Sequence, residues 1–170
     1  MGAGEAEAFC ERLRPSLVGA LGLHTGDRLV AEELAQETLA RAWARWSRLR
    51  RLDSPEAWTF RVALNLARSH WRRAKAERRA NERSGARPPD APPLDQASVL
   101  TVREAVAALP ERQRGAVVCR YYADLSVQQT AEVLGCAEGT VKALTHKAVA
   151  SLRAAIDVDE VEEVGDAEPA

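Results

Sequence analysis

The sequence predicts an all-α protein made of two small helical domains joined by a flexible linker. Phe, Trp and Tyr together make up only 5% of the 170 residues, and few segments show the alternation typical of strands. Apolar residues recur at helical spacing instead, and a proline-rich segment, residues 80–97, interrupts this pattern. The hydrophobic fraction of 46% is ordinary for a globular protein, so each domain can form a core, although a small one.

The first domain, residues 5–79, should contain a long helix that begins after Asp27, whose side chain can cap the first turn. The apolar residues of this helix form a stripe expected to face the core: Leu34, Ala35, Leu39, Ala42, Trp43 and Trp46. Its outer faces carry Glu32, Glu33, Gln36, Glu37 and Arg41. A short basic loop, residues 47–53, should follow.

A second helix of this domain should begin at Ser54 and Pro55, an N-cap followed by a first-turn proline. Four of its polar residues, each about one turn from the next, share one face: Arg61, Asn65, Arg68 and Arg72. A solvated helix face is the alternative, but such faces mix acids with bases, and residues 57–76 contain no acid. We therefore interpret this face as a site for a polyanion. Trp58 and Trp71 lie nearby and are suited to holding unstacked bases.

Residues 80–97 should form the linker, because four prolines and Gly85 disfavour a continuous helix. Charge is also segregated along the chain. Residues 41–87 hold fourteen basic and four acidic residues, whereas residues 157–170 hold seven acids and no Lys or Arg. We interpret residues 157–170 as an acidic tail that is either a disordered solubilising segment or a weak competitor of nucleic acid for the basic surfaces.

The second domain, residues 98–156, should open with an amphipathic helix over residues 99–109, broken at Pro110, and continue with a helix over residues 112–123. Ser126 and Gln129 then form a capping box, which predicts a helix from Val127 to Leu134.

Gly135 supplies the stop of that helix, and the spacing of Ala131, Gly135 and Val141 is typical of a helix-turn-helix. An ordinary helical hairpin is the alternative. Leu134, Val141, Ala148 and Leu152 complete an apolar face.

The polar face of the last helix carries the candidate contacts of this domain. It presents Gly139, Ala143, His146 and Ala150, flanked by Thr140, Lys142 and Lys147. His146 can meet a base or a phosphate, or be a solvated surface residue. Since this face has no Arg, bidentate reading of guanine should be limited, while the lysines can hold phosphates.

Other classes of protein receive little support. Cys10, Cys119 and Cys136 show neither a disulfide framework nor metal-ligand spacing, and no cofactor is indicated. The N-terminus has no basic start followed by an apolar run, so we expect a cytoplasmic protein. An enzyme acting on nucleic acid is disfavoured, because no paired-carboxylate, Cys/His or glycine-rich phosphate loop stands in a suitable place.

Two stretches then match a known family. "GDRLVAEELAQETLARAWARW" followed by "DSPEAWTFRVALNLARSHWRR" resembles region 2 of the sigma-70 family, and "LPERQRGAVVCRYYADLSVQQTAEVLGCAEGTVKALTHKAVASLR" resembles its region 4. The chain is thus similar to extracytoplasmic function sigma factors, most of all to the actinobacterial SigE-like branch. The resemblance covers nearly everything from Phe9 to Ile156.

The resemblance implies a protein that binds the bacterial RNA polymerase core and directs it to promoters, with an anti-sigma factor as a further possible partner. Contacts to the clamp helices of the β′ subunit fall on Glu33, Gln36, Glu37 and Arg41. Recognition and melting of the −10 element fall on Arg48, Arg50, Arg51, Trp58, Arg61, Asn65, Arg68, Arg72 and Arg73. Region 4 is expected to contact the β flap and to read the −35 element through Arg120, Thr140, Lys142, His146 and Lys147.

Two departures from the family pattern affect these expectations. Where many relatives carry "TVKSRLHRA", this chain has "TVKALTHKA", so Ala143 and Leu144 replace a polar and a basic residue. Specificity for the −35 element should be weaker as a result. Ala35 stands where valine is common, which predicts weaker packing there. A helix-turn-helix regulator that binds duplex DNA without polymerase is the remaining alternative, but it leaves the first domain unexplained.

Overall fold

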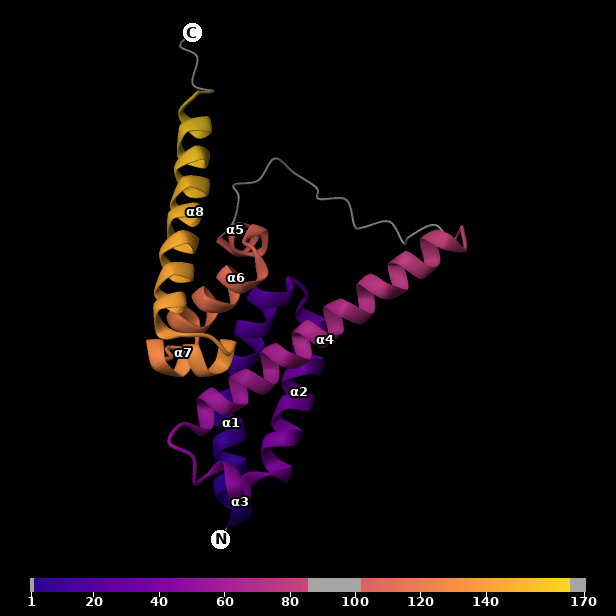
Figure 1. Cartoon of the computed structure of the whole chain (residues 1–170), viewed down its shortest axis with the longest axis vertical. Coiled ribbons are helices and arrows are strands. Elements are labelled where there is room, and N and C mark those ends of the chain that lie inside the picture. Colours follow the sequence, from indigo (N-terminus) through magenta and orange to yellow (C-terminus); the bar gives the residue numbers. More distant parts are fainter. Residues whose placement is uncertain (1, 86–101, 166–170) are drawn as a thin grey trace.

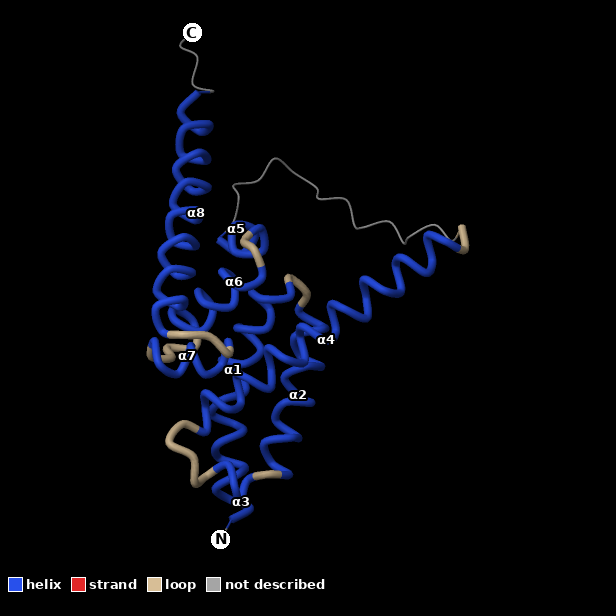
Figure 2. Tube along the Cα trace, viewed as in Figure 1, coloured by secondary structure: helices blue, strands red, loops and turns tan. Residues whose placement is uncertain are grey.

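The structure, a computed structural model, describes residues 2–85 and 102–165, and every regular element in these ranges is a helix. The elements in chain order are α1 (Gly2–Thr25), α2 (Arg28–Ala44), α3 (Trp46–Leu49), α4 (Pro55–Arg83), α5 (Val102–Ala108), α6 (Glu111–Val117), the π-helix η1 (Val118–Tyr122), α7 (Val127–Leu134) and α8 (Glu138–Gly165). Figures 1 and 2 show these helices, with short loops between successive helices inside each described range. The predicted all-α class is confirmed. We call residues 2–85 the first half and residues 102–165 the second half.

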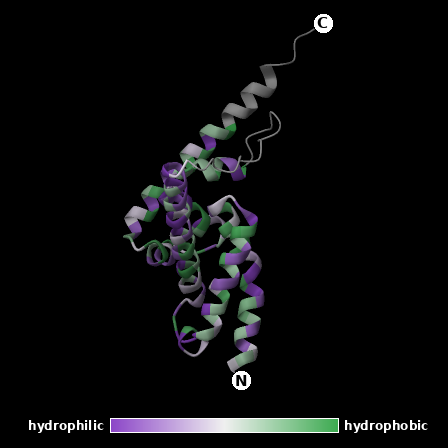
Figure 3. Ribbon diagram, turned by 90° about the vertical axis from the view of Figure 1, so that its right-hand side faces the viewer, coloured by the Kyte–Doolittle hydropathy of each residue, from purple (hydrophilic) through white to green (hydrophobic). Residues whose placement is uncertain are grey.

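The first half is built on α1, α2 and α4, which bury their apolar sides against one another. Leu17, Leu21 and Phe60 are at most 2% exposed at its centre. The predicted caps are present: the Asp27 carboxylate accepts from the backbone N–H of Leu29 at 2.9 Å, and Ser54 Oγ accepts from that of Ala57 at 3.1 Å. Hydrophilic and hydrophobic residues alternate along these helices, as expected when only one side of each is buried (Figure 3).

Three expectations for the first half need correction. Trp43, predicted in the buried stripe, is 47% exposed, because the helix turns that position away from α1 and α4. The predicted loop over residues 47–53 begins as the short helix α3, which buries Leu49. Helix α4 runs through Arg83 and so includes residues 80–83 of the predicted linker, since the first proline comes only at position 88. Residues 86–97 of that linker lie outside the described residues.

The second half contains the predicted helix-turn-helix. Helix α7 spans Val127–Leu134, and both hydrogen bonds of the capping box between Ser126 and Gln129 are formed. Gly135 ends the helix with a φ of 64°, in the left-handed region that glycine adopts without strain. Val141 and Ala148 are fully buried on α8, as the apolar face predicted.

The helix expected over residues 112–123 differs from the prediction in its second part. It is α-helical only over Glu111–Val117 and continues as η1, in which one residue more is accommodated per turn. The Arg120 guanidinium donates to the Leu125 carbonyl just beyond η1, and Asp124 has a φ of 53°. This hydrogen bond satisfies a carbonyl in the tight turn before α7.

The two halves pack directly against each other and share one hydrophobic core. Val106, Val118, Leu125 and Val133 of the second half belong to the same buried cluster as Leu17 and Phe60 of the first. The main contacts run from α4 to α7 and from α1 to η1, α5 and α6. A flexible linker alone does not predict this docking.

Helix α8 extends beyond the other helices and continues to Gly165 (Figure 1). Residues 157–165 of the predicted acidic tail are therefore helical in their backbone, and residues 166–170 lie outside the described residues. Among the described helices, none is long and apolar enough to cross a membrane.

Candidate nucleic-acid interface

The four residues predicted to share one face of α4, here called the α4 basic face, are all exposed: Arg61, Asn65, Arg68 and Arg72. Arg73 on the same helix and Arg48, Arg50 and Arg51 around α3 are exposed as well. Trp58 differs, because it is partly buried and packs against the hydrophobic cluster. Trp58 therefore has a packing role that its position in the sequence did not reveal.

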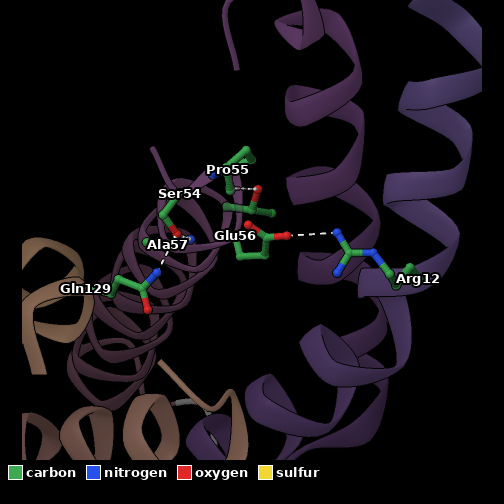
Figure 4. Close-up of polar contacts among 7 residues, drawn as sticks. Arg12, Ser54, Pro55, Glu56, Ala57 and Gln129 are labelled. Atoms are coloured by element: carbon green, nitrogen blue, oxygen red, sulfur yellow. Dashed lines mark hydrogen bonds and ion pairs between the residues drawn. The ribbon is translucent and has the colours of Figure 1, made fainter. Parts of the chain in front are cut away.

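Two exposed ion pairs hold the start of this surface against α1. Arg12 Nη2 lies 2.8 Å from Glu56 Oε1 in the first turn of α4 (Figure 4), and Arg50 Nη1 lies 3.4 Å from Glu5 Oε2. Exposed pairs of this kind contribute about 0–1 kcal/mol each and are screened by salt. Arg50 can thus exchange Glu5 for a phosphate at little cost.

The second half covers one end of the α4 basic face. Gln129 Nε2 donates to Ser54 Oγ at 2.9 Å, which ties the capping box of α7 to the N-cap of α4 (Figure 4). A cavity of about 400 Å³ lies at this contact. Its lining combines Leu52, Asp53, Ser54, Ala57, Trp58 and Arg61 with Ser126, Gln128, Gln129 and Glu132 of the second half. Trp58 and Arg61 therefore face α7 in this arrangement.

The middle of the α4 basic face contacts α6. Arg68 Nε lies 3.0 Å from Glu111 Oε1 in an exposed ion pair. Arg114 Nη1 donates to the His24 carbonyl at the end of α1 at 2.8 Å, and Nη2 donates to the carbonyls of Ala107 and Leu109 at 2.7 and 2.9 Å. Arg114 was not among the predicted site residues; its only sequence signal is a basic residue on an otherwise apolar helix side.

The predicted residues of the helix-turn-helix divide into two groups. Lys142, His146 and Lys147 are exposed on α8, and Thr140 is half-buried near its start. Arg120 is half-buried and its guanidinium is engaged with the Leu125 carbonyl, so it positions the turn before α7.

A cavity of about 360 Å³ opens beside Lys142 and His146. It is lined by Arg120, Tyr121, Val127, Lys142, Thr145, His146, Val149 and Arg153. Sequence reasoning missed Tyr121 and Arg153. The helical spacing of Arg153, two turns after His146, was the available signal, whereas the exposure of Tyr121 depends on the π-helical geometry of η1.

The residues predicted to bind polymerase lie on one helix. Glu33, Gln36, Glu37 and Arg41 are all exposed on α2, and Arg41 Nε pairs with Glu37 Oε1 at 2.8 Å. The exposed ring of Trp43 lies two residues further along. This helix face combines charges of both signs with an accessible aromatic side chain, as protein interfaces often do.

The chemistry that these surfaces can perform is binding. Arginines and lysines hold phosphate oxygens, and an asparagine or an aromatic ring can meet a base. Within residues 2–85 and 102–156, no group of three or more His, Cys, Asp or Glu side chains could hold a metal ion.

Comparison with known proteins assigns both halves to described families. The model for sigma-70 region 2 matches residues 9–77, and the model for sigma-70 region 4 matches residues 100–152. The RNA polymerase sigma-E factor of Streptomyces coelicolor is 30% identical over 149 residues, which cover 88% of this chain and 84% of that protein. The sigma-E factor of Streptomyces antibioticus is 31% identical over 95% of this chain and 92% of its own.

A further relative and a solved structure extend the comparison. The ECF RNA polymerase sigma factor SigL of Mycobacterium tuberculosis is 34% identical over 76% of each chain. The sigma factor RpoE of Bartonella quintana, solved in complex with the anti-sigma factor NepR, is similar with a TM-score of 0.71 and 26% identity. That match covers 90% of this chain and 99% of the solved one.

Proposed function

The chain belongs to the extracytoplasmic function group of the sigma-70 family, and we propose that its two exposed basic surfaces read the two elements of a promoter. As a member of this family it binds the RNA polymerase core and directs promoter-specific initiation of transcription. A helix-turn-helix regulator that works without polymerase is not favoured, because the region 2 match covers residues 9–77 of the first half. We place this activity in the cytoplasm.

The observation that carries the proposal is the α4 basic face, which stays exposed along one helix that has no acid between residues 57 and 76. Arg68, Arg72 and Arg73 would hold phosphates of the −10 region, and Arg48, Arg50 and Arg51 would extend this contact. Asn65 can hydrogen-bond a base edge once the strands separate, and the partly buried ring of Trp58 can receive an unstacked base. In this proposal the phosphate contacts position the protein on the −10 region, and Asn65 and Trp58 recognise its bases.

For the −35 element, Lys142 and Lys147 would hold phosphates on either side of His146 on α8. Tyr121 and Arg153 join this set, since both line the cavity beside His146. We assign Arg120 a positioning role, because its guanidinium holds the Leu125 carbonyl. The exposed face of α2, with Glu33, Gln36, Glu37 and Arg41, is the proposed contact to polymerase.

The docked arrangement of the two halves sets a condition on this function. With Gln129 on Ser54 and Glu111 on Arg68, the second half covers part of the −10 surface. We infer that the halves must move apart before both surfaces can meet one promoter, and that polymerase binding provides this separation. An anti-sigma factor that favours the docked arrangement would oppose it; the similar Bartonella protein was solved in complex with the anti-sigma factor NepR.

A binding titration on promoter DNA with and without core polymerase tests the proposal. The chain alone should bind weakly, with a steep salt dependence and little sequence preference, and should bind tightly and specifically with core. Purified chain should also co-elute with core and start transcripts from a cognate promoter. Equally tight, sequence-specific duplex binding by the isolated chain would support a polymerase-independent regulator instead.

A further inference from the structure

A third cavity, with a largely basic lining, lies between the two halves, where the end of α1, the middle of α4 and the start of α6 meet. Its volume is about 420 Å³, within the range of about 300–1,000 Å³ usual for small-molecule sites. Its lining consists of His24, Arg68, Trp71, Arg72, Lys75, Glu111 and Arg114. Four of these side chains are cations and one is a carboxylate, so the cavity is suited to an anion.

His24 gives the cavity a buried polar group without a protein partner. The residue is only 4% exposed, and its Nδ1 has no hydrogen-bond partner among the described residues. Desolvation by burial, together with the nearby Arg114 guanidinium, lowers the pKa of His24 to about 4. The imidazole is therefore neutral at neutral pH and adds no positive charge of its own. The Nδ1 atom is itself buried, so His24 contributes a neutral side chain to the cavity wall rather than a ligand-binding Nδ1.

The cations of the cavity differ in how strongly they are held. Arg114 is fixed by the carbonyls of His24, Ala107 and Leu109. Arg68 is paired with Glu111 in an exposed and therefore weak contact. Arg72 and Lys75 make no ion pair or hydrogen bond within residues 2–85 and 102–156, and both are exposed. Two cations are thus available to a ligand at once, and a third becomes available when Glu111 is displaced.

Trp71 adds a planar apolar surface to the same cavity. Trp71 is 43% exposed although it lines the cavity, so part of the residue remains accessible to a ring of a ligand. Aromatic rings that stack on a purine and cations that hold phosphates are the two features that nucleotide recognition requires.

From this combination we propose that the cavity binds a free purine nucleoside polyphosphate. Arg72, Lys75 and Arg68 hold its phosphates, and Trp71 stacks on its base. A free nucleotide fits better than a DNA strand, because α6 and the end of α1 wall the cavity, and its volume of about 420 Å³ suits a small ligand. Since both halves contribute lining residues, the nucleotide stabilises their docked arrangement. The further consequence that it competes with promoter DNA for Arg68 and Arg72 rests on the proposed function.

The test is isothermal titration of the full chain with GTP or ATP in the absence of divalent metal, beside guanosine and inorganic pyrophosphate. Both nucleotides should saturate a single site below about 1 mM, and guanosine alone should not bind. Lys75→Ala should weaken nucleotide binding about tenfold, as expected for a lost charge-assisted hydrogen bond. Trp71→Ala should weaken the nucleotides more than it weakens pyrophosphate.

Arg79→Ala is the matched control, because Arg79 is an exposed cation one turn beyond Lys75 on α4 and does not line the cavity. It should change nucleotide affinity less than twofold. Absence of saturable nucleotide binding, or equal losses in Lys75→Ala and Arg79→Ala, would overturn the proposal and indicate only diffuse attraction of anions. Both lining variants are at exposed positions, and their thermal unfolding is compared with the parent protein to verify that they fold. Initiation with core polymerase is assayed separately, so its outcome and that of the titration are independent.

Discussion

Tyr122 lies so close to Gly19 that a Cβ at position 19 would stand 1.8 Å from the Tyr122 Oη. This contact joins η1 of the second half to α1 of the first. A glycine inside a helix costs about 1 kcal/mol relative to alanine, so Gly19 weakens α1 locally. Its place in the helix is explained by the tyrosine that docks on it, and the pair reports directly on the docked arrangement.

Gly19→Ala should therefore displace Tyr122 and weaken the docking of the halves. Tyr122 is 46% exposed and the end of its ring can move aside, so we expect overcrowding to cost about 1 kcal/mol, which the gain in helix propensity of about 1 kcal/mol largely offsets. Gly19→Ala should then be about 1 kcal/mol less stable than a glycine-to-alanine change at an open helix position. Gly22→Ala is the matched control, since a Cβ at that position meets nothing within 4 Å. Denaturant unfolding measures the unfolding free energy of both variants.

The tyrosine provides an independent check of this contact. In the Tyr122→Ala background, where the clash is absent, Gly19→Ala should become neutral or stabilising. A destabilisation of the same size with and without Tyr122 would show that the two residues do not act through each other.

Arg114→Ala should lower the unfolding free energy, because the Arg114 side chain joins α6 to the end of α1. It would leave the half-buried carbonyls of His24 and Leu109 and the exposed carbonyl of Ala107 without their donor, at a cost of about 1–3 kcal/mol. Arg112→Ala, two residues earlier and exposed, should cost less than about 0.5 kcal/mol. Chemical denaturation measures the unfolding free energy of both variants. Equal losses in Arg114→Ala and Arg112→Ala would mean that the hydrogen bonds of Arg114 contribute little to stability.

Acid should destabilise the protein through His24. Its pKa in the folded protein is about 4, below the ordinary 6.5, because burial disfavours the charged imidazole. Between these values the unfolded chain takes up a proton that the folded chain does not, so stability falls as pH falls from about 6.5 to about 4. The loss from this group can approach about 3 kcal/mol. Unfolding free energies measured across this pH range should be flatter for His24→Asn than for the parent protein.

Base and phosphate contacts on α4 should separate in kinetic assays with polymerase. Asn65→Ala should reduce strand opening more than initial promoter binding, whereas Arg72→Ala should weaken binding to all sequences and lower the salt dependence. Trp58→Ala should also reduce opening, with an added loss of stability because its ring packs on the core. Permanganate footprinting of unpaired thymines, run beside a binding titration, distinguishes the two effects, and Arg79→Ala serves as the charge control. Proportional losses of binding and opening in both variants would contradict the assigned roles.

Much of the local structure could be predicted from the sequence. Asp27 and Ser54 cap the helices that they were expected to cap, and α7 begins and ends at the predicted residues because Ser126, Gln129 and Gly135 determine both ends. The exposure of the α4 basic face also followed from spacing, since residues three and four apart share a side of a helix. Such features depend on groups within a few residues of one another, and the sequence alone determines them.

The docking of the halves was decided only by the tertiary structure. Besides the shared hydrophobic core, polar contacts across it join residues 43 apart (Arg68 and Glu111), 75 apart (Ser54 and Gln129) and 90 apart (His24 and Arg114). Packing between distant parts of the chain also explains the partial burial of Trp58 and the close approach of Tyr122 to Gly19. The positioning role of Arg120 and the π-helical geometry of η1 likewise became visible only in the structure. Helical periodicity predicts which face of each helix is apolar. It does not predict which of these faces pack against each other, and the features above depend on that packing.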